Sequence, residues 1–348
     1  MLPSNKITLK KIAHDLNMST STISRALRDN HEINAVTKER ILAYARELNF
    51  RPDTIARTLR NGKSKTIGVV LSTVENPFYS QVINGIESAA YQSGYNVCIT
   101  QSHESYDLEK MQVAHLTRNS VDGILMSLAA GTTDTTYLKR IKDAGLPIVF
   151  FDNIDQGIDS HKVVADNFKG AFEATSQLLN SGYKNVAFIS GPANNSITVE
   201  RMAGYLKALT QNGIIANEAT IKYCMHDGEN DCEIENAIDE LFLLDNRPDA
   251  IFTATDNVST KVFQSIRRRE IQIPDEVALF GFTNSKLAEL TFPALSAVHQ
   301  PGFEMGKKAA EMLLDLIKNN RSNTEYQTVV LPVQLFSRAS SGSITILG

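Results

Sequence analysis

The sequence predicts a protein in two parts: a small all-α head, then a larger α/β body of two lobes, each with a Rossmann-like parallel sheet. Three observations lead to this fold class. The chain has 348 residues, more than one ordinary domain requires. Apolar residues recur at helical spacing up to about residue 50, whereas short β-rich runs alternate with helical stretches beyond Lys65. The sign of the net charge changes at the same place.

Charge divides the chain near residue 65. The whole protein has a formal net charge of −4, which taken alone argues against a nucleic-acid partner. The first 65 residues, however, hold thirteen basic and six acidic side chains, a net charge of +7, which leaves −11 on the other 283. A basic head indicates a polyanion partner for that part alone.

Several classes of protein are excluded by missing patterns. No apolar run approaches the 18 residues of a membrane span, and the N-terminus lacks the layout of a secretory signal. Cys98, Cys224 and Cys232 are odd in number and lack a CxxC spacing, which predicts three buried thiols in a reducing cytoplasm. HExxH, paired histidines at metal-ligand spacing and GxGxxG are also missing. We therefore expect a cytoplasmic protein that is not an enzyme, with no cofactor, metal or membrane partner.

Residues 8–27 predict two short helices joined by a tight turn. The first begins after an N-cap at Thr8, Asn17-Met18 ends it, and Ser19 caps the second. Thr37 is expected to cap a third helix. The apolar residues of these helices recur at i, i+3 and i+4: Leu9, Ile12, Ala13, Leu16; Ile23, Ala26, Leu27; Ile41, Ala45, Leu48. Two short helices braced by a third form a helix-turn-helix arrangement.

The exposed face of the second helix suits DNA. Its first side chains are short, so its backbone can lie deep in the major groove, and serine and threonine hydroxyls can bond base edges. Arg25 can pair bidentately with guanine. A three-helix bundle that binds protein is the alternative for this head.

Residues 49–62 predict one further short helix. Pro52 is a good first residue and Gly62 a good stop, but only about two turns fit, and so short a helix is marginal alone. Arg57 can meet phosphates, while Leu59 belongs to an apolar edge that could equally pack on a neighbour.

Three stretches of this head closely resemble the LacI/GalR family of bacterial transcription regulators: Thr8–Leu27, Glu47-Leu-Asn-Phe50-x-Pro52 and Ala56-Arg57-x-Leu59. The resemblance implies that hinge helices from two subunits enter the minor groove, where Leu59 wedges into a base step. It implies that Thr20, Ser21 and Arg25 read bases, with a phosphate contact as the alternative for Arg25. The expected DNA-binding set is Thr8, Ser19, Thr20, Ser21, Thr22, Ser24, Arg25, Arg28, Asn34, Arg57 and Leu59.

The body is expected to contain two parallel sheets. Its β-rich runs form two series of four, which begin at Ile67, Tyr95, Asp122 and Pro147, and at Val186, Thr220, Ala250 and Val277. The regular spacing is typical of βα units. Open α/β sheets bind ligands beyond the carboxyl ends of their strands, so two lobes facing one another would form a cleft.

The body also resembles this family, in its periplasmic-binding-protein-like effector domain. The stretches that match are Asn76-Pro77-Phe78-Tyr79, Val121-Asp122-Gly123-Ile124, Gly191-Pro192, Arg201-x-x-Gly204-Tyr205, Gly281-Phe282 and His299-Gln300-Pro301. We expect a head over 1–50, a hinge over 51–65 and a body over 66–348. The resemblance implies three crossings between a first lobe, about 66–165 and 294–322, and a second, about 166–293 and 323–340, with the last strand, Thr328–Phe336, in the second lobe.

The resemblance also places the effector in the cleft. Phe78 and Tyr79 would form an aromatic wall, Arg201 a planar fork for hydroxyls or a carboxylate, and Asp256 an acceptor. The full set is Phe78, Tyr79, Asp152, Asn153, Asp166, Asn195, Arg201, Asp256 and Thr283. Asp166 and Asp256 could instead cap helices, and Phe78 could be interlobe core. Thr283 stands where the family commonly has an acidic residue.

The resemblance implies a homodimeric repressor that binds a pseudo-palindromic operator in double-stranded DNA. A carbohydrate-like effector, a sugar or sugar acid, would control its affinity for the operator. A solute-binding protein and a purine-type regulator that needs a co-repressor are the alternatives.

Overall fold

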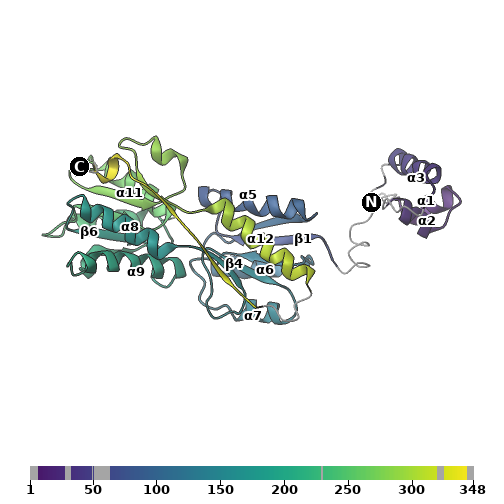
Figure 1. Cartoon of the computed structure of the whole chain (residues 1–348), viewed down its shortest axis with the longest axis horizontal. Coiled ribbons are helices and arrows are strands. Elements are labelled where there is room, and N and C mark those ends of the chain that lie inside the picture. The colour runs from purple at the N-terminus through teal and green to yellow at the C-terminus, as the bar shows by residue number, and fades with distance from the viewer. Residues whose placement is uncertain are drawn as a thin grey trace. The chain divides into compact units, whose positions relative to one another are not determined.

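The computed structural model describes residues 7–27, 33–48, 50, 63–228, 230–319 and 325–342 (Figure 1). Contacts between residues divide the chain into two units, Met1–Ser64 and Lys65–Gly348, which are taken separately below. Among the described residues, no helix is both long and apolar enough to cross a membrane.

The first unit contains three helices around a small apolar core. They are α1 (Leu9–Asp15), α2 (Thr20–Ala26) and α3 (Ala35–Glu47). One isoleucine from each helix, Ile12, Ile23 and Ile41, is fully buried at its centre. Asn17 joins α1 to α2 with a left-handed backbone, φ 53°. The unit is therefore the compact helical head that the spacing of apolar residues predicts.

The expected cap of the third helix was wrong. The helix begins at Ala35, and its N-cap is Asn34, whose Oδ1 accepts a hydrogen bond from the amide of Val36 at 2.9 Å. Thr37 lies within the first turn. Asparagine is as good an N-cap as threonine, so the sequence alone did not decide between Asn34 and Thr37.

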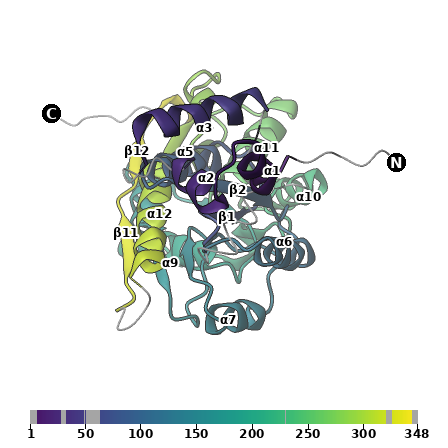
Figure 2. The ribbon, with the colours of Figure 1, turned by 90° about the vertical axis from the view of Figure 1, so that its right-hand side faces the viewer.

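The first lobe of the body is a parallel sheet covered by helices on both faces. Its six strands have the order β11-β5-β4-β3-β1-β2, with β11 at one edge (Figure 2). Its elements are β1 (Thr66–Leu71), α5 (Pro77–Gln92), β2 (Asn96–Gln101), α6 (Tyr106–Arg118), β3 (Ile124–Met126), α7 (Thr136–Asp143), β4 (Ile148–Phe151), β5 (His161–Ala165), α12 (Gly302–Lys318) and β11 (Thr328–Leu331).

The second lobe repeats this plan with one antiparallel edge strand. Its strands have the order β12-β10-β9-β8-β6-β7, and β12 pairs antiparallel to β10. Its elements are α8 (Asn167–Asn180), β6 (Val186–Ser190), α9 (Ser196–Gln211), η1 (Glu218–Thr220), β7 (Ile221–Tyr223), α10 (Asp231–Phe242), β8 (Ala250–Thr253), α11 (Asp256–Arg268), β9 (Ala278–Phe282), η2 (Lys286–Glu289), β10 (Ser296–His299), β12 (Gln334–Phe336) and η3 (Ala339–Ser341).

Two of the expected lobe boundaries were wrong. The segment from about residue 294 was expected in the first lobe, but β10 pairs with β9 in the second, and the chain does not return to the first lobe until Gln300–Pro301. The run Thr328–Phe336 was expected as one strand of the second lobe. It is two strands, of which β11 pairs with β5 in the first lobe and β12 with β10 in the second. A β-rich run in the sequence indicates a strand, but it does not indicate the sheet to which that strand belongs.

The thiols also differ from expectation. Cys224 is buried and Cys98 partly buried, but Cys232 is exposed. Cys232 lies in the first turn of α10, where its amide bonds Asn230, so its side chain need not face the core.

Helices α5 and α12 pack with their backbones in direct contact (Figure 1). Two glycines allow this approach: a β-carbon at Gly306 would overlap the carbonyl oxygen of Val82, and one at Gly85 would overlap that of Phe303. The contact fixes α5, which follows the first strand, against the segment that has crossed back from the second lobe.

Gly306→Ala should therefore destabilise the body, although alanine is the better helix former by about 1 kcal/mol at an open site. Backbone atoms cannot move aside as a flexible side chain can, so we expect an overpacking loss of about 1–3 kcal/mol in the free energy of unfolding. Urea denaturation measures it. Lys307→Ala, at the exposed neighbouring position, is the control and should be close to neutral. Equal stability of Gly306→Ala and the wild type would contradict this packing.

Candidate functional site

The second helix of the head presents a polar, solvent-facing surface. Thr20, Ser21 and Arg25 are exposed on α2, and Thr22 and Ser24 are partly exposed, while Ile23 and Ala26 face the core. These polar side chains lie outside the core and are accessible to a binding partner. Three other expected DNA contacts, Arg28, Arg57 and Leu59, lie outside the described residues.

The remaining expected DNA contacts are all helix caps. Thr8 Oγ1 accepts from the amide of Lys11 at 3.3 Å, and Ser19 Oγ accepts from the amide of Thr22 at 3.1 Å. Asn34 caps α3 in the same way. Each of these three side chains therefore caps a helix. Capping does not require a contact with DNA, and it does not prevent one.

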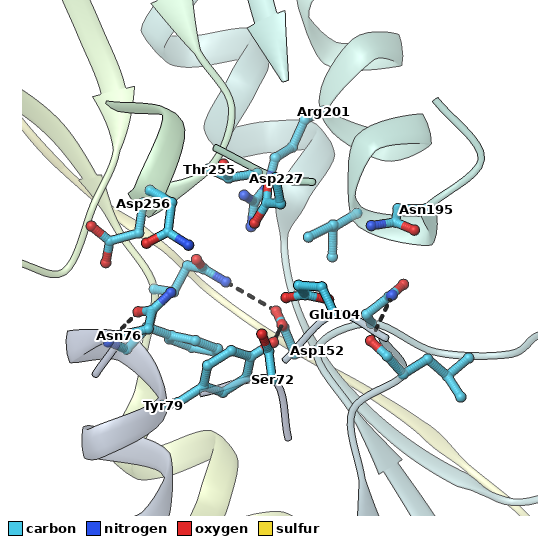
Figure 3. Close-up of a pocket in the computed structure, with 16 residues that line it drawn as sticks. Ser72, Asn76, Tyr79, Glu104, Asp152, Asn195, Arg201, Asp227, Thr255 and Asp256 are labelled. Carbon is cyan, nitrogen blue, oxygen red and sulfur yellow. Dashed lines mark hydrogen bonds between the residues drawn. The ribbon is translucent and has the colours of Figure 1, made fainter. Parts of the chain in front are cut away.

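The body has a cleft between its lobes, at the carboxyl ends of the strands (Figure 3). Its free volume is small, about 30 Å³, so the side chains of the two walls nearly fill it. The first lobe and the crossing after β10 supply Ser72, Asn76, Phe78, Tyr79, Glu104, Leu128, Asp152, Asn153 and Gln300; the second lobe supplies Asn195, Ile197, Arg201, Asp227, Thr255, Asp256 and Asn257.

Arg201 lines this cleft from α9 of the second lobe and is 1% exposed. Its guanidinium lies 3.7 Å above the ring of Phe282, and Nε donates to Asn167 Oδ1 at 2.8 Å. Nη1 donates to the carbonyl oxygen of Ala254, but Nη2 has no hydrogen-bond partner among the described residues. Burial lowers the pKa of Arg201 to about 10, and the charge of Asp152 acts in the opposite direction. The arginine is therefore held firmly in place while one buried donor stays unused.

Tyr79 and Asp152 form the opposite wall, from the first lobe. Tyr79 Oη donates to Asp152 Oδ2 at 3.0 Å, and Gln300 Nε2 donates to Asp152 Oδ1 at 3.3 Å. Burial raises the pKa of Asp152, and burial together with the Asp152 charge raises the pKa of Tyr79 well above its usual value. The rings of Phe78 and Tyr79 are 5.2 Å apart, and both residues line the cleft. The aromatic wall expected from the sequence is thus brought to the site.

Two expected residues lie behind the cleft rather than in its lining. Asp166 caps α8, where its Oδ1 accepts from the amide of Lys169 at 3.1 Å, so the capping alternative describes it. Thr283 donates to Asp256 Oδ1 at 2.6 Å and thereby orients a carboxylate that does line the cleft. Asp256 does not cap its helix, since Thr255 does.

Hydrogen bonds join the two lobes beside the cleft. Ser196 Oγ donates to Asn153 Oδ1 at 2.9 Å and accepts from the amide of Ile154 at 3.0 Å. Asn284 Nδ2 donates to Gln81 Oε1 at 2.8 Å. Ser196 begins the same helix that carries Arg201. The helix that makes one of these contacts between the lobes therefore also carries Arg201.

The sequence did not point to two carboxylates of the cleft, Glu104 and Asp227. They follow β2 and β7, and with Asp152 they have left-handed backbones, φ 55°, 47° and 59°. Such conformations are uncommon outside glycine and are found at functional sites. Polar residues directly after β-rich runs were the signal that could have found them. Ser72, Asn76, Leu128, Thr255, Asn257 and Gln300 were also missed.

Asp227 is the least satisfied of these carboxylates. Its Oδ1 is buried and has no hydrogen-bond partner in the described part of the chain. Burial is the main cause that raises its pKa to about 8, and the charge of Glu104 across the cleft acts in the same direction.

Comparison with known proteins decides the family. The model of bacterial regulatory proteins of the lacI family matches residues 8–53, and that of the periplasmic binding protein-like domain matches 175–341. The HTH-type transcriptional repressor PurR of Vibrio atlanticus is 30% identical over 90% of this chain and 92% of its own. The chain belongs to the LacI family.

Two further similarities span almost the whole of this LacI-family protein. Catabolite control protein A of Priestia megaterium is 29% identical over 96% of this chain and 99% of its own. The solved complex of the transcriptional regulator CelR with cellobiose has a TM-score of 0.71 at 26% identity, over 96% of this chain and 99% of that one. The family consists of DNA-binding transcription regulators rather than enzymes, so head and body together follow one regulator plan.

Substitution of Asp227 by asparagine should stabilise the protein at neutral and higher pH. A carboxyl whose pKa is raised in the folded state holds its proton more tightly when folded, so its contribution to stability falls as pH rises from about 4 to about 8. The asparagine side chain does not titrate, and the variant should melt at higher temperature than the wild type at pH 8, with the gain shrinking toward pH 4. Each unit of pKa shift corresponds to about 1.4 kcal/mol.

Thermal melting across that pH range measures this difference. Asp245→Asn makes the same chemical change at an exposed position of the same lobe and should leave the pH profile close to that of the wild type. A difference between Asp227→Asn and wild type that does not vary with pH would contradict the buried, protonated carboxyl.

Proposed function

We propose that this LacI-family protein is a cytoplasmic transcriptional repressor that binds a pseudo-palindromic operator as a homodimer. A carbohydrate-like effector in the interlobe cleft controls its affinity for that operator. The observation that carries this proposal is the cleft centred on Arg201, in a chain whose relatives are named as repressors and whose head exposes short polar side chains on α2.

The head is suited to reading base edges. Thr20 and Ser21 at the start of α2 are exposed and short, which lets a helix enter the major groove closely. Arg25, one turn further, offers a bidentate donor for guanine. Two such heads related by a twofold axis would contact two half-sites, which is why we propose a dimer on a pseudo-palindrome.

The cleft is suited to a polyhydroxylated ligand. Its lining offers the Arg201 donor and four carboxylates, which can accept from neighbouring hydroxyls, beside the rings of Phe78 and Tyr79. The CelR complex contains cellobiose, a sugar, in a protein of similar fold and 26% identity. These features support a carbohydrate-like effector.

The effector would control DNA binding by changing how the two lobes are arranged relative to one another. A ligand that contacts both walls favours one arrangement of the lobes to the extent that it binds that arrangement better. The hydrogen bonds of Asn153 and Asn284 across the cleft are contacts that hold such an arrangement. We propose that the effector thereby changes the spacing of the hinge segments, residues 51–65, and releases the operator.

Operator binding tests this function. The purified protein should bind DNA from upstream of its own gene with sequence preference and a steep dependence on salt, as phosphate contacts require. A thermal-shift screen of sugars, sugar acids and nucleobases should then identify a ligand that lowers this affinity. Salt-dependent binding without sequence preference, or a ligand that binds the cleft without changing operator affinity, would contradict the proposal. A nucleobase that tightens operator binding would favour the purine-type alternative.

Arg25→Ala should relax base preference at one position of each half-site and cost about 1–3 kcal/mol there. The loss is local because a bidentate arginine distinguishes guanine from other bases. Selection from a randomised operator library measures it. Arg46→Ala removes the same charge from α3 and should at most weaken binding uniformly. A uniform loss for Arg25→Ala would make Arg25 a phosphate contact.

Leu59→Ala should weaken specific operator binding by about tenfold or more, because the wedge that supports a bent operator is removed. Effector affinity should not change. Leu59→Met keeps an apolar wedge and is the matched variant, expected to retain most of the binding. Operator titrations by fluorescence anisotropy distinguish the three proteins, and wild-type affinity in Leu59→Ala would show that Leu59 is not a wedge.

A further inference from the structure

Carboxylates from both lobes gather at one end of the cleft. Glu104 and Asp152 come from the first lobe and Asp227 from the second, and Figure 3 shows Asp227 next to Arg201, with Glu104 and Asp152 across from it. With Asp256, four carboxylates line the cleft, and Arg201 is the sole basic side chain among the described lining residues. The formal charge of the lining is therefore strongly negative.

Most of these carboxylates already have donors. Glu104 Oε2 accepts from the amide of Ala130 at 2.5 Å, and Asp152 accepts from Tyr79 and Gln300. Asp227 differs, because its buried Oδ1 accepts no hydrogen bond from the described residues. Nη2 of Arg201 is likewise buried and unused within the described part of the chain. Two residues of the lining thus hold buried polar atoms without a partner in the described residues: an acceptor on Asp227 and a donor on Arg201.

The two unpaired atoms, Arg201 Nη2 and Asp227 Oδ1, would form hydrogen bonds with different groups of a ligand. A hydroxyl oxygen can accept from Arg201 Nη2, but an ammonium cannot. Asp227 Oδ1 can accept from a hydroxyl or an ammonium, and the charge of Glu104 favours the ammonium, since the Glu104 charge and burial together resist a second anion at Asp227. A metal ion is the other cation to consider, but no cluster of three or more possible ligands that could hold one occurs in the described residues.

We propose that the effector is a polyhydroxylated molecule carrying an ammonium group, as in an amino sugar. The ammonium would lie between Asp227 and Glu104, with a neighbouring hydroxyl on Arg201 Nη2. This inference rests on the proposed effector role of the cleft and narrows its ligand class. It also disfavours the sugar-acid half of the expectation from sequence, since a carboxylate ligand would face the charge of Glu104 and a lining with one arginine among four acidic side chains.

The character of the lining agrees with such a ligand. Its side chains are mostly polar, and the rings of Phe78 and Tyr79 provide its apolar part. A charge-assisted hydrogen bond contributes more than a neutral one, by an amount that corresponds to about tenfold in affinity. The preference should therefore be measurable against a ligand that differs in one group only.

The test compares matched ligands on the full-length protein by isothermal titration calorimetry. In each of the gluco, galacto and manno series, the 2-amino sugar is set against the parent sugar, the N-acetyl derivative and the uronic acid. We expect the amine to bind about tenfold or more tightly than the parent in the series whose stereochemistry fits, and the acid to bind weakest. Asp227→Asn should reduce that preference to about parity, whereas Glu75→Gln, an exposed neighbour outside the cleft, should retain it.

Equal or tighter binding of a parent sugar or an acid overturns the inference, and so does a lack of binding by every amine. Retention of the amine preference in Asp227→Asn overturns it as well. Operator binding, measured on the same preparations without ligand, checks that the variants are folded. Loss of sequence-specific operator binding by the wild type would instead be a failure of the proposed function, so the two failures are distinguishable.

Discussion

The arrangement of the cleft depends on one buried charge, the guanidinium of Arg201. Arg201 is 1% exposed, and a charge removed from water to that degree costs several kcal/mol unless partners compensate for it. Asn167, the carbonyl of Ala254 and the ring of Phe282 compensate from its own lobe, and the charge of Asp152 from the other. One donor, Nη2, remains unused among the described residues. The guanidinium that interacts electrostatically with Asp152 of the other lobe thus also keeps one unpaired donor.

Several features of the cleft around Arg201 lower the stability of the folded protein. Glu104, Asp152 and Asp227 have left-handed backbones, and burial raises the pKa of both aspartates. Such features destabilise the empty protein and persist because the surrounding sheets fix them. Packing of α5 on α12 through Gly85 and Gly306 supplies part of that rigidity. In the proposed function, a ligand that bonds these unpaired atoms and contacts both lobes would favour one arrangement of the lobes to the extent that it binds that arrangement better.

Local structure was predictable because its signals are local. Thr8 and Ser19 cap the helices that their positions predict, and the β-rich runs from Ile67 to Val277 all contain strands. Sheet membership was not predictable from the residues, since β11 and β12 are close in sequence yet pair in different lobes. The strands β5 and β10 were not among the two series of β-rich runs expected from the sequence. Arg201 was found through family resemblance. Asp227, in an irregular loop after β7, belongs to none of the matching stretches, and only its position after a β-rich run could have indicated it.

The division of charge along the chain now has a structural meaning. The basic head holds exposed polar side chains on α2, and the acidic body concentrates carboxylates around one arginine. If a ligand completes the hydrogen bonding of Arg201, a crystal structure of the protein with a bound effector will reveal the contact. We predict a ligand oxygen about 2.7–3.2 Å from Arg201 Nη2. An effector bound in the cleft without that contact would show that Arg201 is not the group on which ligand binding depends.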